Sequence, residues 1–190
     1  VWGSTFVPQK IAMLHWSPLQ FTSLRFLIGG IVLLFFVNFS SKIIKNIKEF
    51  LFFCILSGSV LALAALTQQI GIIDTTATNA GFYTSLYILI VPIIGLFLYK
   101  SIHWSVLPSI IICFIGSLLL GSPGDMISLS NIQSGDLWII FSAVFWALHL
   151  HIVSYSVSKF PIFKFSIIQF IICGLLLFFY GIIFENNDFL

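Results

Sequence analysis

Apolar residues run along the chain in long, uninterrupted stretches that short polar segments separate. These polar segments leave seven apolar stretches, at residues 1–14, 19–39, 50–73, 76–99, 104–120, 137–157 and 165–184. A transmembrane helix needs about 20 apolar residues, whereas a barrel strand needs about 10 and alternates between apolar and polar positions. The pattern therefore predicts an all-α, multispanning transmembrane helix bundle, and its first stretch is short for a span.

The composition supports a membrane protein, because 59% of the residues are hydrophobic and only 7% are charged. Soluble domains carry about 25% charged residues. The net charge of +2 is too small and too scattered for a nucleic-acid binder. Cys54, Cys113 and Cys173 lie far apart in apolar stretches, so we expect packing residues rather than disulfides or metal ligands. The chain opens on Val1 with no signal-peptide pattern, and we expect it to begin inside a helix.

The few charges predict how the chain lies across the membrane. Assigning alternate loops to alternate sides gathers six of the eight cations on one side: Lys42, Lys45, Lys48, Lys100, Lys159 and Lys164. The other side receives five carboxylates and no Lys or Arg: Asp74, Asp125, Asp136, Glu185 and Asp188. By the positive-inside rule the lysine-bearing loops are cytoplasmic, in the cell (inner) membrane. Amphipathic rings at the expected span ends agree with these boundaries, at Trp16, Tyr99, Trp104 and Trp138.

The sequence contains an internal repeat. A shift of 144 residues aligns seven pairs: Trp2 with Trp146, Phe21 with Phe165, Phe26 with Phe170, Ile28 with Ile172, Gly30 with Gly174, Leu33 with Leu177 and Phe35 with Phe179. Each copy also has a proline in its short turn, Pro18 or Pro161. The repeat unit is therefore five spans long. Because five is odd, the second copy enters from the opposite side, and such inverted repeats are characteristic of secondary transporters.

Several short motifs together resemble the EamA-like family of the drug/metabolite transporter superfamily. Along the chain they are WGSTFV at 2–7 followed by Lys10, Ser17-Pro18, Leu24-Arg25-Phe26, residues 76–99 with Pro92, Trp104, Gly116-Ser117-Leu118-Leu119-Leu120, Gly135-Asp136-Leu137, Trp146-Ala147 and Gln169-Phe170. The resemblance covers nearly the whole chain. One position departs from the family pattern, because Lys100 stands where an acidic residue often follows the fourth helix.

The resemblance implies a ten-helix protein built from two five-helix repeats. On that basis we expect residues 1–121 to form the first repeat with a truncated first helix, 122–136 an external connection, and 137–190 the start of the second repeat. The start of the first helix and all of helices eight to ten would then lie outside this chain.

Lys10 and Arg25 are the leading candidates for a solute cavity. A cation in the hydrocarbon region costs about 2.5–3.5 kcal/mol on insertion scales. Both residues are expected about 9–10 Å below the outer turn, at matched depth on adjacent helices. They could help to bind an anionic or carboxylate-bearing solute, or organise the outer gate. Alternatively, they extend to the membrane surface or pair with Asp74.

The fourth stretch offers a second set of candidates. Ala77, Gly81 and Ser85 recur every four residues and form a helix-packing seam. A polar stripe suited to a solute cavity repeats at the same spacing on a neighbouring face, at Asn79, Tyr83 and Tyr87. Interhelical hydrogen bonding by the stripe is the structural alternative. Pro92 is the hinge candidate, with a static kink as its alternative.

Other polar and aromatic residues in the spans complete the cavity candidates. Gln169 occupies the repeat position of Arg25, and Gln68 and Gln69 close the third stretch; packing is the default interpretation for these glutamines. Trp2 and Trp146 could stack on a solute or serve in packing. His149 and His151 are two residues apart and point about 200° apart on a helix, so they do not bind one metal. One of them, with His149 as the candidate, could face the bundle.

The residues favour a transporter over an enzyme. No HExxH, GxSxG, Walker A or GxGxxG pattern occurs, and we expect no catalytic residue, cofactor or metal. The leading hypothesis is a secondary carrier of small metabolites or drugs, with alternating access between inverted repeats. The alternatives are a non-transporting membrane scaffold or receptor and a membrane-embedded lipid-modifying enzyme. Expected partners are the lipid bilayer, a small solute and further C-terminal helices, but no nucleic acid; whether two copies form a homodimer is left open.

Overall fold

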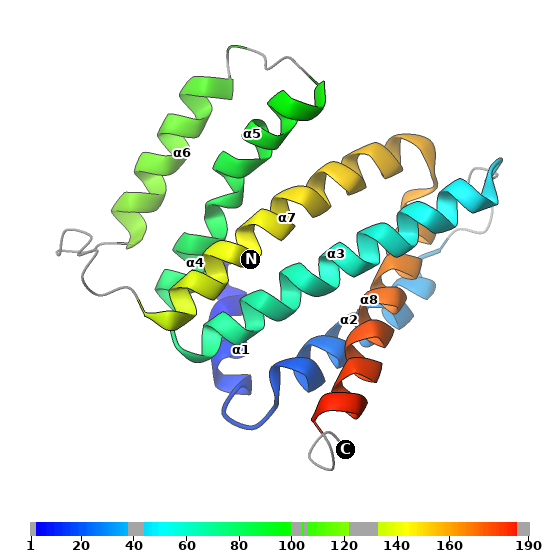
Figure 1. The fold of residues 1–190 in the computed structure, drawn as a ribbon, viewed down its shortest axis with the longest axis horizontal. Helices are drawn as coiled ribbons and strands as arrows, with labels where there is room; N and C mark the ends of the chain where they lie inside the picture. Colours follow the sequence, from blue (N-terminus) through cyan, green and yellow to red (C-terminus); the bar gives the residue numbers. More distant parts are fainter. Residues whose placement is uncertain (1–2, 38–43, 100–103, 105, 122–132, 186–190) are drawn as a thin grey trace. The chain divides into compact units, whose positions relative to one another are not determined.

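The computed structural model describes residues 3–37, 44–99, 104, 106–121 and 133–185 (Figure 1). Within these ranges the regular elements are helices, which confirms the all-α bundle. They are the 3₁₀ turn η1 (Gly3–Thr5) and the α-helices α1 (Phe6–Ala12), α2 (Pro18–Leu34), α3 (Ile47–Ile73), α4 (Ala77–Ser85), α5 (Tyr87–Tyr99), α6 (Val106–Gly121), α7 (Ser134–Lys159) and α8 (Ile162–Phe184). Lys42, Lys100, Asp125, Asp188 and Trp2 lie outside the described residues.

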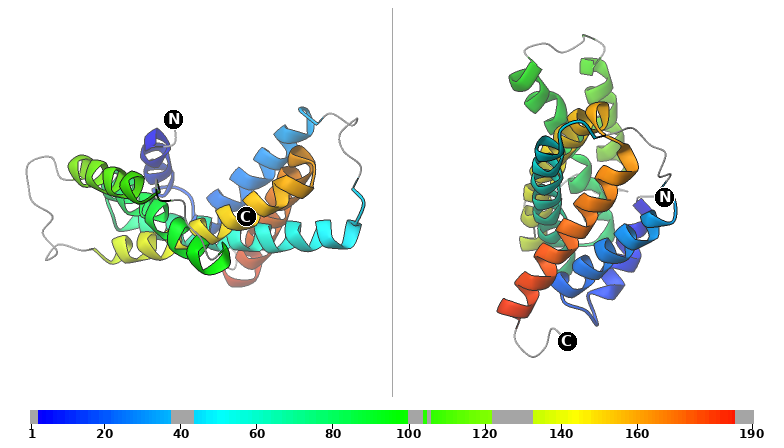
Figure 2. Two further views of the ribbon diagram at one scale, coloured as in Figure 1. Left: turned by 90° about the horizontal axis from the view of Figure 1, so that it is seen from above. Right: turned by 90° about the vertical axis from the view of Figure 1, so that its right-hand side faces the viewer.

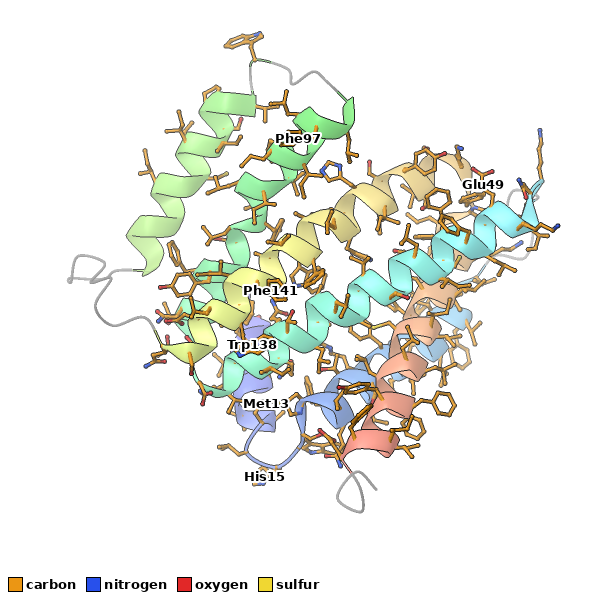
Figure 3. All side chains as sticks on the ribbon, viewed as in Figure 1. Met13, His15, Glu49, Phe97, Trp138 and Phe141 are labelled. Atoms are coloured by element: carbon orange, nitrogen blue, oxygen red, sulfur yellow. The ribbon has the colours of Figure 1, made fainter. Side chains whose placement is uncertain are left out.

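Four segments of the described chain are long and apolar enough to cross a membrane: Ile47–Ile73, Ala77–Leu98, Ser134–Lys159 and Ile162–Phe184. The helix Pro18–Leu34 is apolar but shorter. Many large apolar side chains lie on the outside of the helices, as a lipid solvent requires. Two of them, Phe97 and Phe141, are labelled in Figure 3. Phe97 is 80% exposed and Phe141 is 50% exposed. The chain is therefore an integral membrane protein.

The segment Ala77–Leu98 is not one continuous helix. Leu86 separates α4 from α5, and its amide donates to the carbonyl of Tyr83, three residues earlier rather than four. Pro92 lies inside α5, which continues through it. The interruption thus falls six residues before the proline that the sequence suggested as a hinge.

The chain divides into two compact units, and α3 and α7 contribute to both. Unit 1 comprises Val1–His15 and Thr67–Leu148, and unit 2 comprises Trp16–Leu66 and His149–Leu190. The core of unit 1 is the apolar cluster of Phe6, Ile72, Ala80 and Ile139. The end of α3 meets the start of α7 at two glycines, where a Cβ on Gly135 would lie only 2.3 Å from the carbonyl oxygen of Gly71.

Unit 2 contains the crossing of α2 with α8 (Figure 1, Figure 2). Ser17 and Gln20 form a capping box at the start of α2, where Pro18 occupies the first turn. The Ser17 hydroxyl also donates to a Glu185 carboxylate oxygen at 2.6 Å, which joins the start of α2 to the end of α8. The two helices therefore run antiparallel.

Two contacts across this crossing follow the 144-residue repeat: in each, a residue of α2 contacts a residue of α8, and the repeat counterparts of the two residues also contact each other. The ring of Phe26 packs edge-on against that of its own counterpart Phe170, with centroids 5.3 Å apart. A Cβ on Gly30 would lie 3.1 Å from a side-chain carbon of Ile171, and a Cβ on its counterpart Gly174 would lie 2.6 Å from Leu27, the counterpart of Ile171. The crossing thus has a local pseudo-two-fold arrangement.

The start of α3 meets the end of α7 in unit 2. Phe50, Cys54, Phe160 and Phe165 form a buried apolar cluster there. Next to it Lys159 donates to Glu49 at 2.9 Å and also to the Tyr155 hydroxyl. Glu49 is labelled in Figure 3. Of the three cysteines, Cys54 and Cys173 are buried as expected, whereas Cys113 is exposed.

Candidate functional site

Three buried polar side chains meet inside unit 2, each from a different membrane-spanning helix. The Ser57 hydroxyl of α3 donates to the Gln169 amide oxygen of α8 at 2.6 Å. The Nε2 atom of His149, on α7, lies 3.2 Å from the same oxygen. The three residues are 0%, 4% and 8% exposed, in the order Ser57, Gln169 and His149. We refer to them as the polar triplet.

The polar triplet lies deep within its helices. Ser57 is ten residues from the start of α3, and His149 is ten residues from the end of α7. At 1.5 Å per residue both lie about 15 Å from those helix ends, which the Glu49–Lys159 ion pair joins. That distance is about half the thickness of the hydrocarbon core. The polar triplet is therefore near the middle of its spans, where polar groups are costly and commonly functional.

The chemistry of the amide fixes the direction of the hydrogen bonds. An amide oxygen only accepts, and it accepts from the Ser57 hydroxyl. The contact with His149 is a hydrogen bond when Nε2 carries the proton, which assigns that tautomer from the network. Together the three side chains hold a hydroxyl, an amide and an imidazole in one buried place.

The sequence predicted two members of the polar triplet and missed the third. His149 and Gln169 were cavity candidates, and the structure brings them together. Ser57 was not a candidate, although the following glycine offered a signal: a Cβ on Gly58 would lie 2.9 Å from the backbone oxygen of Gln169. Gly58 therefore allows α8 to approach α3 closely enough for Ser57 to reach the amide.

Arg25 lies on α2 in unit 2 and is half-buried. Its guanidinium carbon is 5.0 Å from the centroid of the Phe26 ring and 5.5 Å from that of Phe21. These distances are typical of cation–π interactions. The aromatic rings thus provide part of the environment that lets a cation stay within an apolar helix.

Lys10 lies in unit 1, where its amine caps the end of α3. It donates to the carbonyl oxygens of Ile72 at 2.9 Å, Ile73 at 2.8 Å and Thr75 at 2.7 Å. The last carbonyls of a helix lack intrahelical partners and carry partial negative charge, so a cation there is stabilising. The amine contacts backbone oxygens rather than the Asp74 carboxylate that the structural alternative proposed.

Asp136 lies in the first turn of α7, although the sequence assigned it to the external connection 122–136. It is 1% exposed. One carboxylate oxygen accepts a hydrogen bond from the backbone N–H of Gln133 at 3.0 Å, and the other accepts one from the hydroxyl of Thr75. The sequence did contain a signal for this helix start, because acidic residues are common in the first turn of a helix. The α7 helix begins at Ser134, and residues 122–132 of the expected connection lie outside the described residues.

The candidates of the fourth stretch, which lie on α4 and at the start of α5, do not all have the same kind of neighbour. Gly81 faces the Phe6 ring, 3.7 Å from an added Cβ, and Ala77 packs beside the same cluster, as a seam requires. Ser85 instead donates to the carbonyl of Phe82 on its own helix at 2.6 Å. The polar stripe is divided by the break at Leu86, because Asn79 and Tyr83 lie on α4 and Tyr87 begins α5. Tyr83 packs against the apolar cluster.

Of the remaining candidates, Gln68, Gln69 and Trp146 lie in unit 1, and His151 lies in unit 2. Gln68 donates to the Thr84 hydroxyl at 2.9 Å, a buried bond between α3 and α4 that favours the packing interpretation. Gln69 is fully buried, and its side-chain amide has no hydrogen-bond partner among the described residues. Trp146 is half-buried on α7, and His151 is half-buried two residues after the buried His149.

Residues 1–122, about two thirds of the chain, match the sequence model of the EamA-like transporter family. The chain belongs to this family. An uncharacterized transporter of Archaeoglobus fulgidus is 30% identical over 159 residues, which cover 82% of this chain and 46% of that relative. This EamA-like chain thus spans about half the length of the curated relative. No solved structure matches it.

The EamA-like match covers only part of the site. Lys10, Arg25 and Ser57 lie within residues 1–122, whereas His149 and Gln169 follow it. The polar triplet thus joins a residue inside the family match to two residues beyond it.

Proposed function

We propose that this EamA-like chain forms part of a secondary carrier of small metabolites or drugs, and that the polar triplet contacts the solute. Membership of a transporter family supports the transport activity. The exchange of contacts between α2 and α8 supports an inverted repeat, the architecture in which two halves rock around a midplane site.

The observation that carries the proposed site is the meeting of Ser57, Gln169 and His149 near mid-span. Solute sites are mostly apolar with a few converging hydrogen-bond groups, and the polar triplet provides such groups within apolar helices. The competing interpretation is a purely structural network that ties three helices together. The two interpretations differ in whether a change at the polar triplet alters transport per molecule or only the amount of folded protein.

We further propose that the lysine-bearing loops face the cytoplasm of a cell membrane. Two described lysines, Lys159 and Lys48, lie at the end of α7 and the start of α3, which the Glu49 ion pair joins. Asp74 and Asp136 lie at the opposite ends of these two helices. The ends of α3 and α7 thus carry opposite signs of charge, which supports the assignment by the positive-inside rule.

The experiment measures transport directly. Intracellular and extracellular solutes are compared by mass spectrometry in cells that express the complete protein and in cells that lack it. Each solute that changes is then followed with Ser57→Ala and Gln169→Leu. We expect transport per folded molecule to fall about tenfold in each variant, because each variant would lose one hydrogen bond to the solute, of about 1.4 kcal/mol.

Ser156→Ala is the matched control. Ser156 is as buried as Ser57 and belongs to the same unit, but its hydroxyl donates to the Ile152 carbonyl of its own helix at 2.7 Å. We expect it to transport normally. Unchanged transport in Ser57→Ala and Gln169→Leu would show that the polar triplet is structural, and the absence of flux for every solute would favour the scaffold alternative.

A further inference from the structure

Three backbone carbonyls at the end of α3 converge on one point in unit 1. They belong to Ile72, Ile73 and Thr75, and the ammonium of Lys10 occupies the point at 2.7–2.9 Å from each oxygen. We call these three carbonyls the carbonyl cage. Rings of backbone carbonyls replace the hydration shell of a monovalent cation in selectivity filters, and helix C-terminal ends coordinate Na⁺ in several transporters.

The electrostatic surroundings of the carbonyl cage also favour a cation. The end of a helix carries about half a negative charge. Two acidic residues are neighbours of the cage residues, because Asp74 lies between Ile73 and Thr75 in the chain and the Thr75 hydroxyl donates to the carboxylate of Asp136. Among the described residues, Lys159 and Glu49 form an ion pair, whereas the Lys10 ammonium is not within ion-pair distance of a carboxylate. Lys10 is therefore held by the carbonyl cage itself.

We propose that the carbonyl cage is a monovalent-cation site, and that the tethered ammonium of Lys10 occupies it in place of a free ion. When Lys10 is removed, the same oxygens bind K⁺, Na⁺ or the ammonium group of a small amine. Ile73 and Asp74 are exposed, so a free cation can reach the carbonyl cage from the surface. This site is separate from the polar triplet and does not depend on the transport proposal.

Tethering explains why the natural protein needs no free cation at this position. A group attached to the same chain competes at an effective concentration of about millimolar or more, without any loss to dilution. The natural protein is therefore expected to unfold at the same temperature whichever monovalent salt is present.

The experiment measures the midpoint of thermal unfolding of the complete protein in detergent, at equal ionic strength in NaCl, KCl, methylammonium chloride or choline chloride. Lys10→Met keeps the unbranched stem and removes the ammonium. We expect its midpoint to be lowest in choline, which is too bulky for the carbonyl cage, and to rise saturably by about 2–4 °C in a salt whose cation fits. A rise in KCl or NaCl identifies a metal ion as the ligand, and a rise confined to methylammonium identifies an organic amine.

The matched control is Lys48→Met, the same substitution at an exposed lysine near the start of α3. Its midpoint, like that of the natural protein, should be equal in all four salts. Equal midpoints for Lys10→Met in the four salts would overturn the proposal. Aggregation of Lys10→Met in every salt, while Lys10→Arg and Lys48→Met fold, would also overturn it, because the carbonyl cage would then accept no untethered cation.

Discussion

The contact between Gly71 and Gly135 sets how closely α3 and α7 approach in unit 1, and Gly135→Ala tests it. The added Cβ would lie 2.3 Å from the carbonyl oxygen of Gly71 and 2.6 Å and 2.8 Å from the carbonyl carbon and oxygen of Asp74. All three are backbone atoms, which cannot move aside by changing a rotamer. Ordinary contact begins at 3.4 Å, so the helix ends must separate by about 1 Å.

The cost of this separation follows from the groups that it disturbs. Overpacking a well-packed contact costs about 1–3 kcal/mol. The Thr75 hydroxyl also reaches the Asp136 carboxylate across the same junction, and a buried carboxylate that loses a hydrogen bond costs a further 1–3 kcal/mol or so. We therefore expect Gly135→Ala to destabilise the protein by about 2–6 kcal/mol, the combined range of these two effects.

The assay is the midpoint of thermal unfolding in detergent, followed by circular dichroism. At about 2–4 °C per kcal/mol for a chain of this size, the midpoint of Gly135→Ala should fall by at least about 4 °C. Gly116→Ala is the control, because Gly116 is also helical, but no atom of the described residues beyond its own helix backbone and chain neighbours lies within 4 Å of an added Cβ. Alanine there should leave the midpoint unchanged or raise it slightly, since it is the better helix former. Equal midpoints for the two variants would refute the close contact.

Two other predictions concern unit 2. Gly174→Ala should destabilise more than Gly30→Ala, because the added Cβ would lie 2.6 Å from Leu27 in the first case and no closer than 3.1 Å to any neighbour in the second; thermal unfolding of both variants measures the difference, and the opposite order would contradict the geometry. Glu49→Gln and Lys159→Met, combined in a double-mutant cycle, should give only a small coupling energy, because both side chains are partly exposed; a large coupling would indicate that this end is less accessible to water.

The helices were predictable because membrane spans leave a strong pattern in the sequence. Each of the seven apolar stretches contains a helical segment, and the long continuous runs of α3 and α8 explain why. The break at Leu86 was not predictable, because no proline or glycine stands at that position. The sequence instead indicated Pro92, six residues further along, as the site of a hinge or kink. The start of α7 was placed three residues late, since Ser134, Gly135 and Asp136 form a polar first turn that composition alone assigns to a loop.

The candidate site was predictable only where a residue type is unusual in an apolar stretch. His149 and Gln169 stand out as polar residues in apolar stretches, and the structure places them within hydrogen-bonding distance. Serine is common in membrane helices, so Ser57 gave no signal by itself. Lys10 was singled out as a cation inside an apolar stretch, but its acceptors are backbone carbonyls, which every residue has and which no sequence pattern marks.

The α2–α8 crossing gives the 144-residue repeat a geometric test that sequence matching lacks. In a chain rich in Phe, Ile and Leu, aligned residues can agree by chance, but a chance alignment does not predict that Phe26 meets its own counterpart Phe170. The polar groups at the crossing do not follow this symmetry. Arg25 lies over aromatic rings, whereas its counterpart Gln169 joins Ser57 and His149. The pseudo-two-fold relation therefore constrains the apolar packing of the two helices, whereas the polar contacts of Arg25 and Gln169 differ between them.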